Sequence, residues 1–330
     1  MGARGWGVWP RLDVGAGRRY TGRSESDLMV LEELKHRISS LQRGDVSPRR
    51  PSESTEGEAR ASADLARHFP EGAVCETGRG DAFVCETPLR KIYSEAPALT
   101  ARYRAAFRKA KKLARRGDLP VHLEPLAEAS SRATALIDTE TAGFHGRPLF
   151  LIGLIRPRGR GFVVTQYFAR TYAEEAGVLS QFADLLPEVD LLISFNGKAF
   201  DWPFVRDRMV YHRLRCDPRF AHVDLLYPSR RRWRSELPNC RLQTLERYLC
   251  GRWRSGDIPG EEIPQRYHDF VRGQDARLIA PIFHHNRLDL IAMMELLIAL
   301  VEGGEEERVV SSRAAGATAG GGSGKGAVDV

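Results

Sequence analysis

Four acidic side chains lie inside apolar stretches of this chain, and they restrict its fold more than any other sequence feature. They are Asp138 and Glu140 in TALIDTETAGF, Asp201 in LLISFNGKAFDWPF, and Asp289 in HHNRLDLIAMMELL. An ionised carboxylate in apolar surroundings is costly unless a cation accompanies it. Because a divalent metal ion is the natural companion, the pattern predicts a carboxylate metal site.

The pair Asp138 and Glu140 lies in a predicted strand. Because successive side chains of a strand alternate between its faces, Leu136, Asp138 and Glu140 share one face. Two carboxylates this close would repel and raise one pKa unless hard cations lie between them. An exposed strand end is the alternative, and a lone D-x-E pattern fits it equally well.

Asp201 follows a strand-like run and an Asn196-Gly197 turn, and it opens a helical pattern with Pro203 just inside. Such a position is typical of a helix start. Asp201 could therefore be the N-cap of this helix, and taken alone this interpretation is favoured over metal binding.

Asp289 raises the same question, because Asn286 as a cap followed by Asp289 would make a pair like a capping box. However, Asp289, Met293, Leu296 and Leu300 fall at i, i+4, i+7 and i+11. This spacing puts the carboxylate on the helix face that should be buried. A solvated capping residue should not lie there.

The hydrophobic pattern predicts an α/β fold with a mixed β-sheet flanked by helices. Strands are expected at 133–139, 149–156, 161–168 and 191–195, a fifth at 221–225, and helices near 174–186 and 202–213. Asp224 ends the fifth strand and is a rival acid. We favour a capping role for it, since no second acid shares its face.

Composition and charge divide the 330 residues into four parts. Residues 1–72 are expected to be mostly disordered with one amphipathic helix near 27–43, and 303–330 to form a flexible tail. Residues 73–130 should supply a short hairpin and a basic helix at about 101–116 that leads into the core domain, 131–302. That basic helix could be a solvated linker or a nucleic-acid contact.

Overall composition excludes some classes of protein. A hydrophobic content of 42% suffices for one good-sized domain plus extensions. The net charge of +7 and pI near 9.3 suggest a polyanionic partner. No stretch predicts a membrane span or a signal peptide, so a cytoplasmic protein without a membrane partner is expected.

The order of the acids resembles that of DEDD exonucleases on a ribonuclease-H-like fold. More narrowly, the chain resembles the YprB-like ribonuclease-H-like family through LIDTET, ISFNGKAFDWPF, HVDLLYPSRRRW with LQTLER, GDIPGEEIPQRY and HHNRLD. The match runs from about Thr134 to Leu300. GRGDAFVCETPL at 78–89 is a fainter match to a segment that precedes the nuclease domain in this family.

The resemblance implies a nuclease, in particular a 3′–5′ exonuclease, that hydrolyses DNA or RNA with two Mg²⁺ or Mn²⁺ ions. It implies that Asp138 bridges both ions, that Glu140 and Asp289 complete the first site, and that Asp201 supports the second. The substrate would be single-stranded or have a free 3′ end. A helicase partner and a DNA-repair role are family-level expectations.

A histidine ahead of Asp289 is expected to act as general base, because an unperturbed imidazole titrates near pH ~6.5. His284 has the H-x4-D spacing of one exonuclease subgroup. His285 lies one helical turn from Asp289 and has the spacing of the YprB-like family. We favour His285, and His284 remains the alternative.

Candidate substrate contacts flank the acids. Thr139, Asn196 and Lys198 could hold phosphate or sugar, although Asn196 could serve only to form the turn. The block 230–234, RRRWR, suits single-strand binding, or it is a solvated loop with Trp233 packed inward. A rival from another class is a non-catalytic nucleic-acid-binding or adaptor module that retains the fold.

Overall fold

The computed structural model describes residues 65–143, 146–215 and 218–303. The helix expected near 27–43 and the tail from residue 304 lie outside the described residues. Among the helices of the described segments, none combines the length and hydrophobicity needed to cross a membrane.

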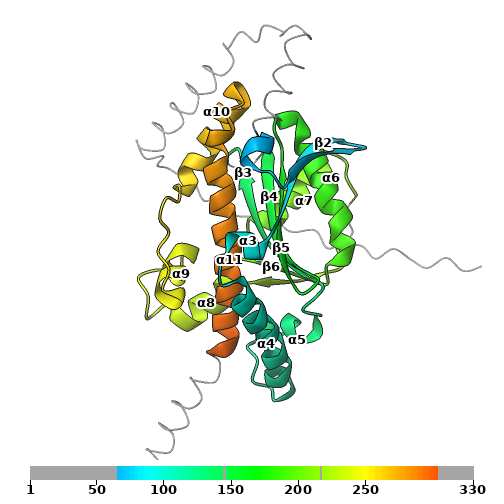
Figure 1. The fold of residues 1–330 in the computed structure, drawn as a ribbon. Coiled ribbons are helices and arrows are strands. Elements are labelled where there is room, and N and C mark those ends of the chain that lie inside the picture. The colour runs from blue at the N-terminus through cyan, green and yellow to red at the C-terminus, as the bar shows by residue number, and fades with distance from the viewer. Residues whose placement is uncertain (1–64, 144–145, 216–217, 304–330) are drawn as a thin grey trace, which may run out of the picture. The chain divides into compact units, whose positions relative to one another are not determined.

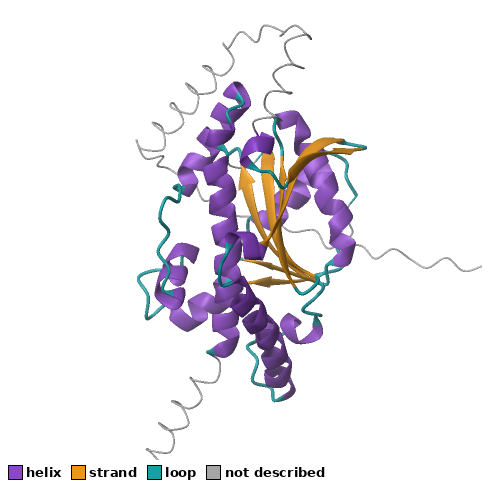
Figure 2. Ribbon diagram, in the orientation of Figure 1, coloured by secondary structure: helices purple, strands orange, loops and turns teal. Residues whose placement is uncertain are grey.

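A seven-stranded mixed sheet forms the centre of the described residues, in the order β1-β2-β5-β4-β3-β6-β7 (Figures 1 and 2). The strands are β1 Gly72–Thr77, β2 Gly80–Pro88, β3 Thr134–Thr141, β4 Leu149–Arg158, β5 Gly161–Phe168, β6 Leu191–Ser194 and β7 Ala221–Asp224. β3, β6 and β7 run parallel, and the other pairs are antiparallel. The predicted mixed sheet is thereby confirmed.

The β1–β2 hairpin extends the same sheet, because β2 pairs with β5 along six residue pairs from Phe83 to Pro88. At the opposite end of the antiparallel part, β3 pairs with β4 until the register shifts between Glu140 and Thr141. Such an irregularity bends a strand and re-aims its side chains. It falls directly at the predicted carboxylate pair.

Helices cover both faces of the sheet. They are α3 Leu89–Ile92, α4 Ala96–Arg115, α5 Pro125–Glu128, α6 Glu175–Leu185, α7 Asp201–Tyr211, α8 Leu226–Trp233, α9 Leu242–Cys250, α10 Ile263–Gly273 and α11 Ala280–Glu302. α6 and α7 pack on one face, whereas α11 crosses the other with α4 and α9 against it (Figure 1).

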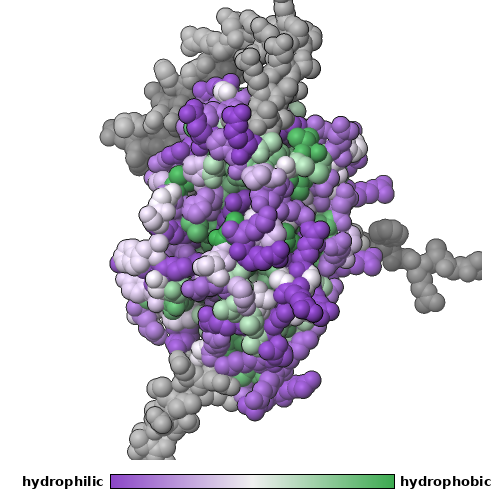
Figure 3. All heavy atoms as spheres, viewed as in Figure 1, coloured by the Kyte–Doolittle hydropathy of each residue, from purple (hydrophilic) through white to green (hydrophobic). Residues whose placement is uncertain are grey.

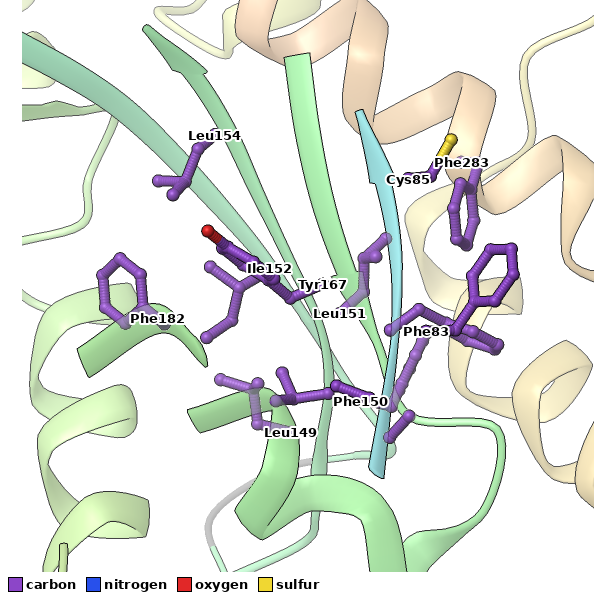
Figure 4. Close-up of a cluster of buried hydrophobic side chains, with 14 of the residues drawn as sticks. Phe83, Cys85, Leu149, Phe150, Leu151, Ile152, Leu154, Tyr167, Phe182 and Phe283 are labelled. Atoms are coloured by element: carbon purple, nitrogen blue, oxygen red, sulfur yellow. The ribbon is translucent and has the colours of Figure 1, made fainter. Parts of the chain in front are cut away.

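Two apolar clusters pack against the sheet, and one of them includes residues on both of its faces. On the α6 side, Phe182 packs with Ile152 and Leu154, while Phe283 of α11 lies beside Phe83 across the sheet (Figure 4). Burial of such large side chains contributes about 1.5–3 kcal/mol each. The face in view in Figure 3 is mainly hydrophilic, with small apolar patches between polar residues. The core therefore fixes the relative positions of β3, α7 and α11.

Candidate active site

The predicted carboxylate pair lies at the C-terminal end of β3, on the face that α11 covers. Leu136, two residues earlier on that face, is buried in the cluster that contains Leu290 and Met293 of α11. The Oδ2 of Asp138 accepts a hydrogen bond of 2.8 Å from the side-chain Nδ2 of Asn286. The strand alternation inferred from sequence therefore points Asp138 at α11.

Asn286 reaches Asp138 through a space that a glycine leaves open. Gly153 lies opposite Asp138 in the β3–β4 register, and a Cβ at this position would come within 1.9 Å of the Asn286 Oδ1. Gln166 on β5 donates to the same Oδ1 at 2.9 Å. Because Asn286 is fully buried and held from both sides, its amide fixes the Asp138 carboxylate.

Asp201 is the first residue of α7, and its carboxylate faces β3. It accepts hydrogen bonds from the backbone N (3.1 Å) and the Oγ1 (2.6 Å) of Thr139. Phe200 is the N-cap residue of α7, and no side chain caps this helix end. The capping interpretation of Asp201 is therefore wrong. The hydroxyl of Thr139 already has Asp201 as its acceptor, which leaves substrate binding by Thr139 a prediction.

The turn before α7 is held by Asp224 of β7. Asn196 has a φ of +65°, a left-handed conformation that asparagine tolerates better than most residues. The Asp224 carboxylate accepts from the backbone N of Asn196 (2.7 Å), Lys198 (3.0 Å) and Leu226 (3.0 Å). Asp224 thus caps backbone groups, and it places the Lys198 side chain at the exposed surface.

Asp289 lies in the interior of α11, which begins at Ala280. The interpretation of Asn286 and Asp289 as a capping pair is therefore wrong, since six helical residues precede Asn286. Met293 and Leu296 are almost completely buried, as the spacing predicted. Both histidines are helical, so their rings point in different directions. His284 is exposed and His285 is only 7% exposed.

His285 bridges two carboxylates. Its Nδ1 lies 2.8 Å from the Oδ1 of Asp257, and its Nε2 lies 3.4 Å from the Oδ2 of Asp289. Burial opposes the charged ring, but the hydrogen bond with Asp257 and the nearby Asp289 and Glu140 outweigh burial and raise the pKa of His285. The hydrogen bonds and charges of His285 and Arg254 overcome burial and lower the pKa of Asp257 to about 2.

A buried arginine also reaches the acids. Arg254, in the loop after α9, pairs with Asp289 (2.5 Å), Asp257 (3.0 Å) and Glu246 (2.5 Å). Its side chain is 8% exposed. Removing one partner of such a largely buried ion pair is strongly destabilising, because the charge of the other partner would be left unpaired. Arg254 therefore ties the loop to α11 beside the candidate base.

Among the described residues, the other three acids have no directly paired counter-ion, although the charge of His285 acts on Glu140. Asp138, Glu140 and Asp201 form no ion pair with any described residue. Burial and the neighbouring carboxylates raise the pKa of Asp138 above its usual range. Burial raises the pKa of Glu140 to about 8, although the charge of His285 opposes this rise. Burial also raises the pKa of Asp201 to about 6, although the hydrogen bonds from Thr139 oppose it.

These carboxylates have the donor chemistry that a hard divalent cation requires, and a cation would relieve the repulsion that raises their pKa values. Asp289 could bind the same ion only if the guanidinium of Arg254 moved away from its carboxylate. Within the described segments, no three His, Cys, Asp or Glu side chains are arranged closely enough to form a ready ligand set. The three unpaired acids thus fit a metal chemically, and Asp289 is already neutralised.

Neutralising Glu140 is expected to stabilise the metal-free protein. A carboxyl group whose pKa is higher in the folded than in the unfolded state destabilises the folded protein. This destabilisation grows as the pH rises from the pKa of the unfolded state to that of the folded state. Glu140→Gln should therefore match the wild type below about pH 4.5 and gain progressively up to about pH 8. We expect a gain of about 1 kcal/mol or more, measured by urea unfolding in a chelator. A Glu140→Gln variant that is less stable at pH 8 would contradict the unpaired cluster.

The sequence left open whether the block 230–234 and the basic helix contact nucleic acid, and the structure now places both. Trp233 is 7% exposed in α8, so it packs inward and is not available for stacking on a base. In α4, Tyr103 hydrogen bonds to Thr134 at the start of β3, whereas the acids lie at the end of that strand. Arg102 of α4 pairs with Glu302. The basic helix is therefore remote from the carboxylates along β3.

Sequence reasoning missed three side chains that contact or orient the acids: Asn286, Asp257 and Arg254. Asn286 was interpreted as a cap, and Asp257 lay in a quoted family block without a role. Arg254 and Asp257 occupy a loop without periodicity, so no pattern links them to α11. The one available signal in the sequence is the apolar residue Ile258 next to Asp257. In the structure Ile258 is buried, and it anchors this loop.

The mixed sheet with carboxylates at the end of β3, at the start of α7 and on α11 defines a ribonuclease-H-like protein. The sequence model of the RNase_H superfamily matches residues 135–301, just over half of the chain, and the chain belongs to this superfamily. Membership establishes a ribonuclease-H-like fold. A specific activity has to be argued from the site.

More narrowly, the chain is YprB-like. It is 35% identical over 168 residues to the uncharacterized protein YprB of Bacillus subtilis (strain 168), which covers 49% of this chain and 40% of YprB. The match thus spans well under half the length of that relative. The family B DNA polymerase of the hyperthermophilic archaeon Pyrobaculum calidifontis is similar over 51% of this chain and 24% of its own, at 19% identity and a TM-score of 0.42. At that level the polymerase adds no support for an activity.

Proposed function

We propose that this protein is a metal-dependent nuclease that hydrolyses phosphodiester bonds, with 3′–5′ exonuclease activity. The observation that carries the proposal is the convergence of Asp138, Glu140 and Asp201, none of which forms a direct ion pair with a described residue, next to a histidine that Asp257 orients. Asp138, Glu140, Asp201 and Asp289 would hold two Mg²⁺ or Mn²⁺ ions. Such ions lower the pKa of water and stabilise the leaving oxygen.

The chain's own groups have separate tasks in this proposal. Asn286 and Thr139 hold Asp138 and Asp201 in fixed orientations through hydrogen bonds of 2.6–3.1 Å. With its Nδ1–H donated to Asp257, His285 presents Nε2 toward the acids, where it can accept a proton from the attacking water. Lys198 and Asn196 border the site and are proposed to contact the phosphate or sugar.

One observation favours the second candidate, a non-catalytic nucleic-acid-binding or adaptor module. The resemblance implies a metal ion beside Asp289, and the Nη2 of Arg254 lies there instead, 2.5 Å from this carboxylate. A permanent guanidinium at this point would exclude an ion from Asp289. The two candidates therefore differ in whether Arg254 can yield to a metal.

Nucleotide release separates the two candidates. DNA and RNA labelled at the 5′ or the 3′ end are incubated with the protein while Mg²⁺ or Mn²⁺ is titrated. A nuclease releases nucleotides only with metal, and loss of the 3′ label first establishes the polarity. Binding without release at saturating metal would instead support the adaptor module. Cytoplasmic location, a helicase partner and a role in repair remain proposals at the level of the family.

A further inference from the structure

A cavity of about 580 Å³ lies between α9 and the loop that follows it, beside the candidate active site. Its volume is within the range of ~300–1,000 Å³ that is usual for small-molecule sites. Arg254 and Asp257 form part of its wall, and the same two side chains contact Asp289 and His285. The cavity is therefore joined to the carboxylates through shared residues.

Two of the side chains that line the cavity are aromatic and face water. Trp253 is 69% exposed and Tyr248 is 53% exposed. Exposed aromatic rings that line a cavity offer a face on which a base can stack. The guanidinium of Arg247 lies 3.4 Å from the Trp253 ring centroid and 5.6 Å from that of Tyr248. Cation and aromatic rings thus form one surface.

The charge of this wall suits an anion. Arg247 forms no ion pair with the residues that the structure describes, and its charge is directed only at the two rings. Arg252 and Arg254 are paired with Glu246, among other acids. Of the three cavity arginines, Arg247 is therefore the one available to a phosphate.

We propose that this cavity is a binding subsite for an unpaired nucleotide of the nucleic-acid substrate, with the base stacked on Trp253 and the phosphate held by Arg247. In a duplex the faces of a base are covered by its neighbours. An exposed indole beside Arg247, whose guanidinium lies over one face of the ring and forms no ion pair among the described residues, therefore selects a single strand. The subsite rests on the proposed nuclease function. It deepens that function by assigning Trp253 and Arg247 as the residues that would bind an unpaired nucleotide.

Binding without hydrolysis tests the subsite. The full chain is titrated onto a 5′-fluorescent oligothymidylate in a chelator, and onto a blunt duplex of the same length, with anisotropy as the readout. Trp253→Ala should raise the Kd for the single strand about tenfold and leave duplex binding unchanged. Trp253→Phe, which retains a stacking face, should remain close to the wild type.

The chain offers a matched control in Tyr211 of α7. Tyr211 is also 69% exposed and also carries an arginine, Arg208, at 4.2 Å from its ring centroid. It lies at the end of α7 remote from Asp201. Tyr211→Ala should therefore leave single-strand binding unchanged. Thermal unfolding of both alanine variants checks that the fold is retained.

Arg247→Ala adds a second measurement. Loss of one phosphate contact should reduce the magnitude of the log–log salt slope for single-strand binding by about 0.7. An unchanged Kd in Trp253→Ala, or equal losses for duplex and single strand, would overturn the subsite. Nucleotide release is assayed separately with Mg²⁺. Absence of release together with the Trp253 effect would refute the nuclease proposal and leave the subsite standing.

Discussion

Asp138→Asn is expected to lower metal-dependent nucleotide release by about 10³-fold or more, even at saturating Mn²⁺. Asp138 is the acid that feels all three of the others, since Asp289, Glu140 and Asp201 each contribute to its raised pKa. Asparagine has the same shape and can still accept the hydrogen bond from Asn286. The substitution should therefore remove the charge that holds the metal and leave the fold intact.

The matched control for this variant is Asp184→Asn. Asp184 is an exposed acid on α6, across the sheet from the carboxylate cluster. Release by this variant should equal that of the wild type. Calorimetric titration of Mn²⁺ into Asp138→Asn should show weakened binding alongside the lost activity. Wild-type turnover in Asp138→Asn would exclude the carboxylate cluster as the metal site.

His285→Ala is expected to slow single-turnover hydrolysis by about 10²-fold or more and to remove the acidic limb of the pH–rate profile. The reason is geometric: only His285 of the two adjacent histidines lies against Asp257 and Asp289, at 2.8 Å and 3.4 Å. A general base must be neutral to accept a proton, so its removal abolishes the loss of rate at low pH. His284→Ala should have a mild effect because that side chain is exposed.

Asp257 supplies a companion to this experiment. We assign it a positioning role, because it holds the Nδ1 of His285 and lies behind the ring relative to the acids. Asp257→Asn retains an acceptor for Nδ1–H and should keep more activity than Asp257→Ala, which should lose about tenfold or more. A large defect confined to His284→Ala would reverse the assignment of the base.

The predicted elements agree with the structure where local periodicity and packing demand the same result. The strand at 161–168 and the meander that contains it follow from apolar runs too short for helices, and β5 has the same bounds. The face shared by Leu136 and Asp138 follows from the two-residue repeat of a strand. α4 was expected from 101 and begins at Ala96, because Pro97 is compatible with a first turn.

Local patterns failed where a side chain has more than one possible partner. Asp201 has the position of a cap, and only its contact with β3 excluded that interpretation. For Asp289 the buried-face spacing already argued against a cap, and the start of α11 at Ala280 excluded it. The sequence did not decide whether Trp233 stacks on a base or packs inward, and in the structure its side chain is buried. In each case the competing states differ by contacts with segments far away in the chain.

The sequence alone determined the mixed sheet, the face on which the β3 carboxylates point and the buried stripe of α11, because the periods of strands and helices are local properties of the backbone. Tertiary structure decided between His285, which the spacing favoured, and His284. It alone showed that Asp257 and Arg254 join the acids and that Trp253 stays exposed. Those contacts bring residues of an aperiodic loop against α11. Side-chain charge and packing across such distances in the chain leave no repeat in the sequence, so only the folded arrangement reveals them.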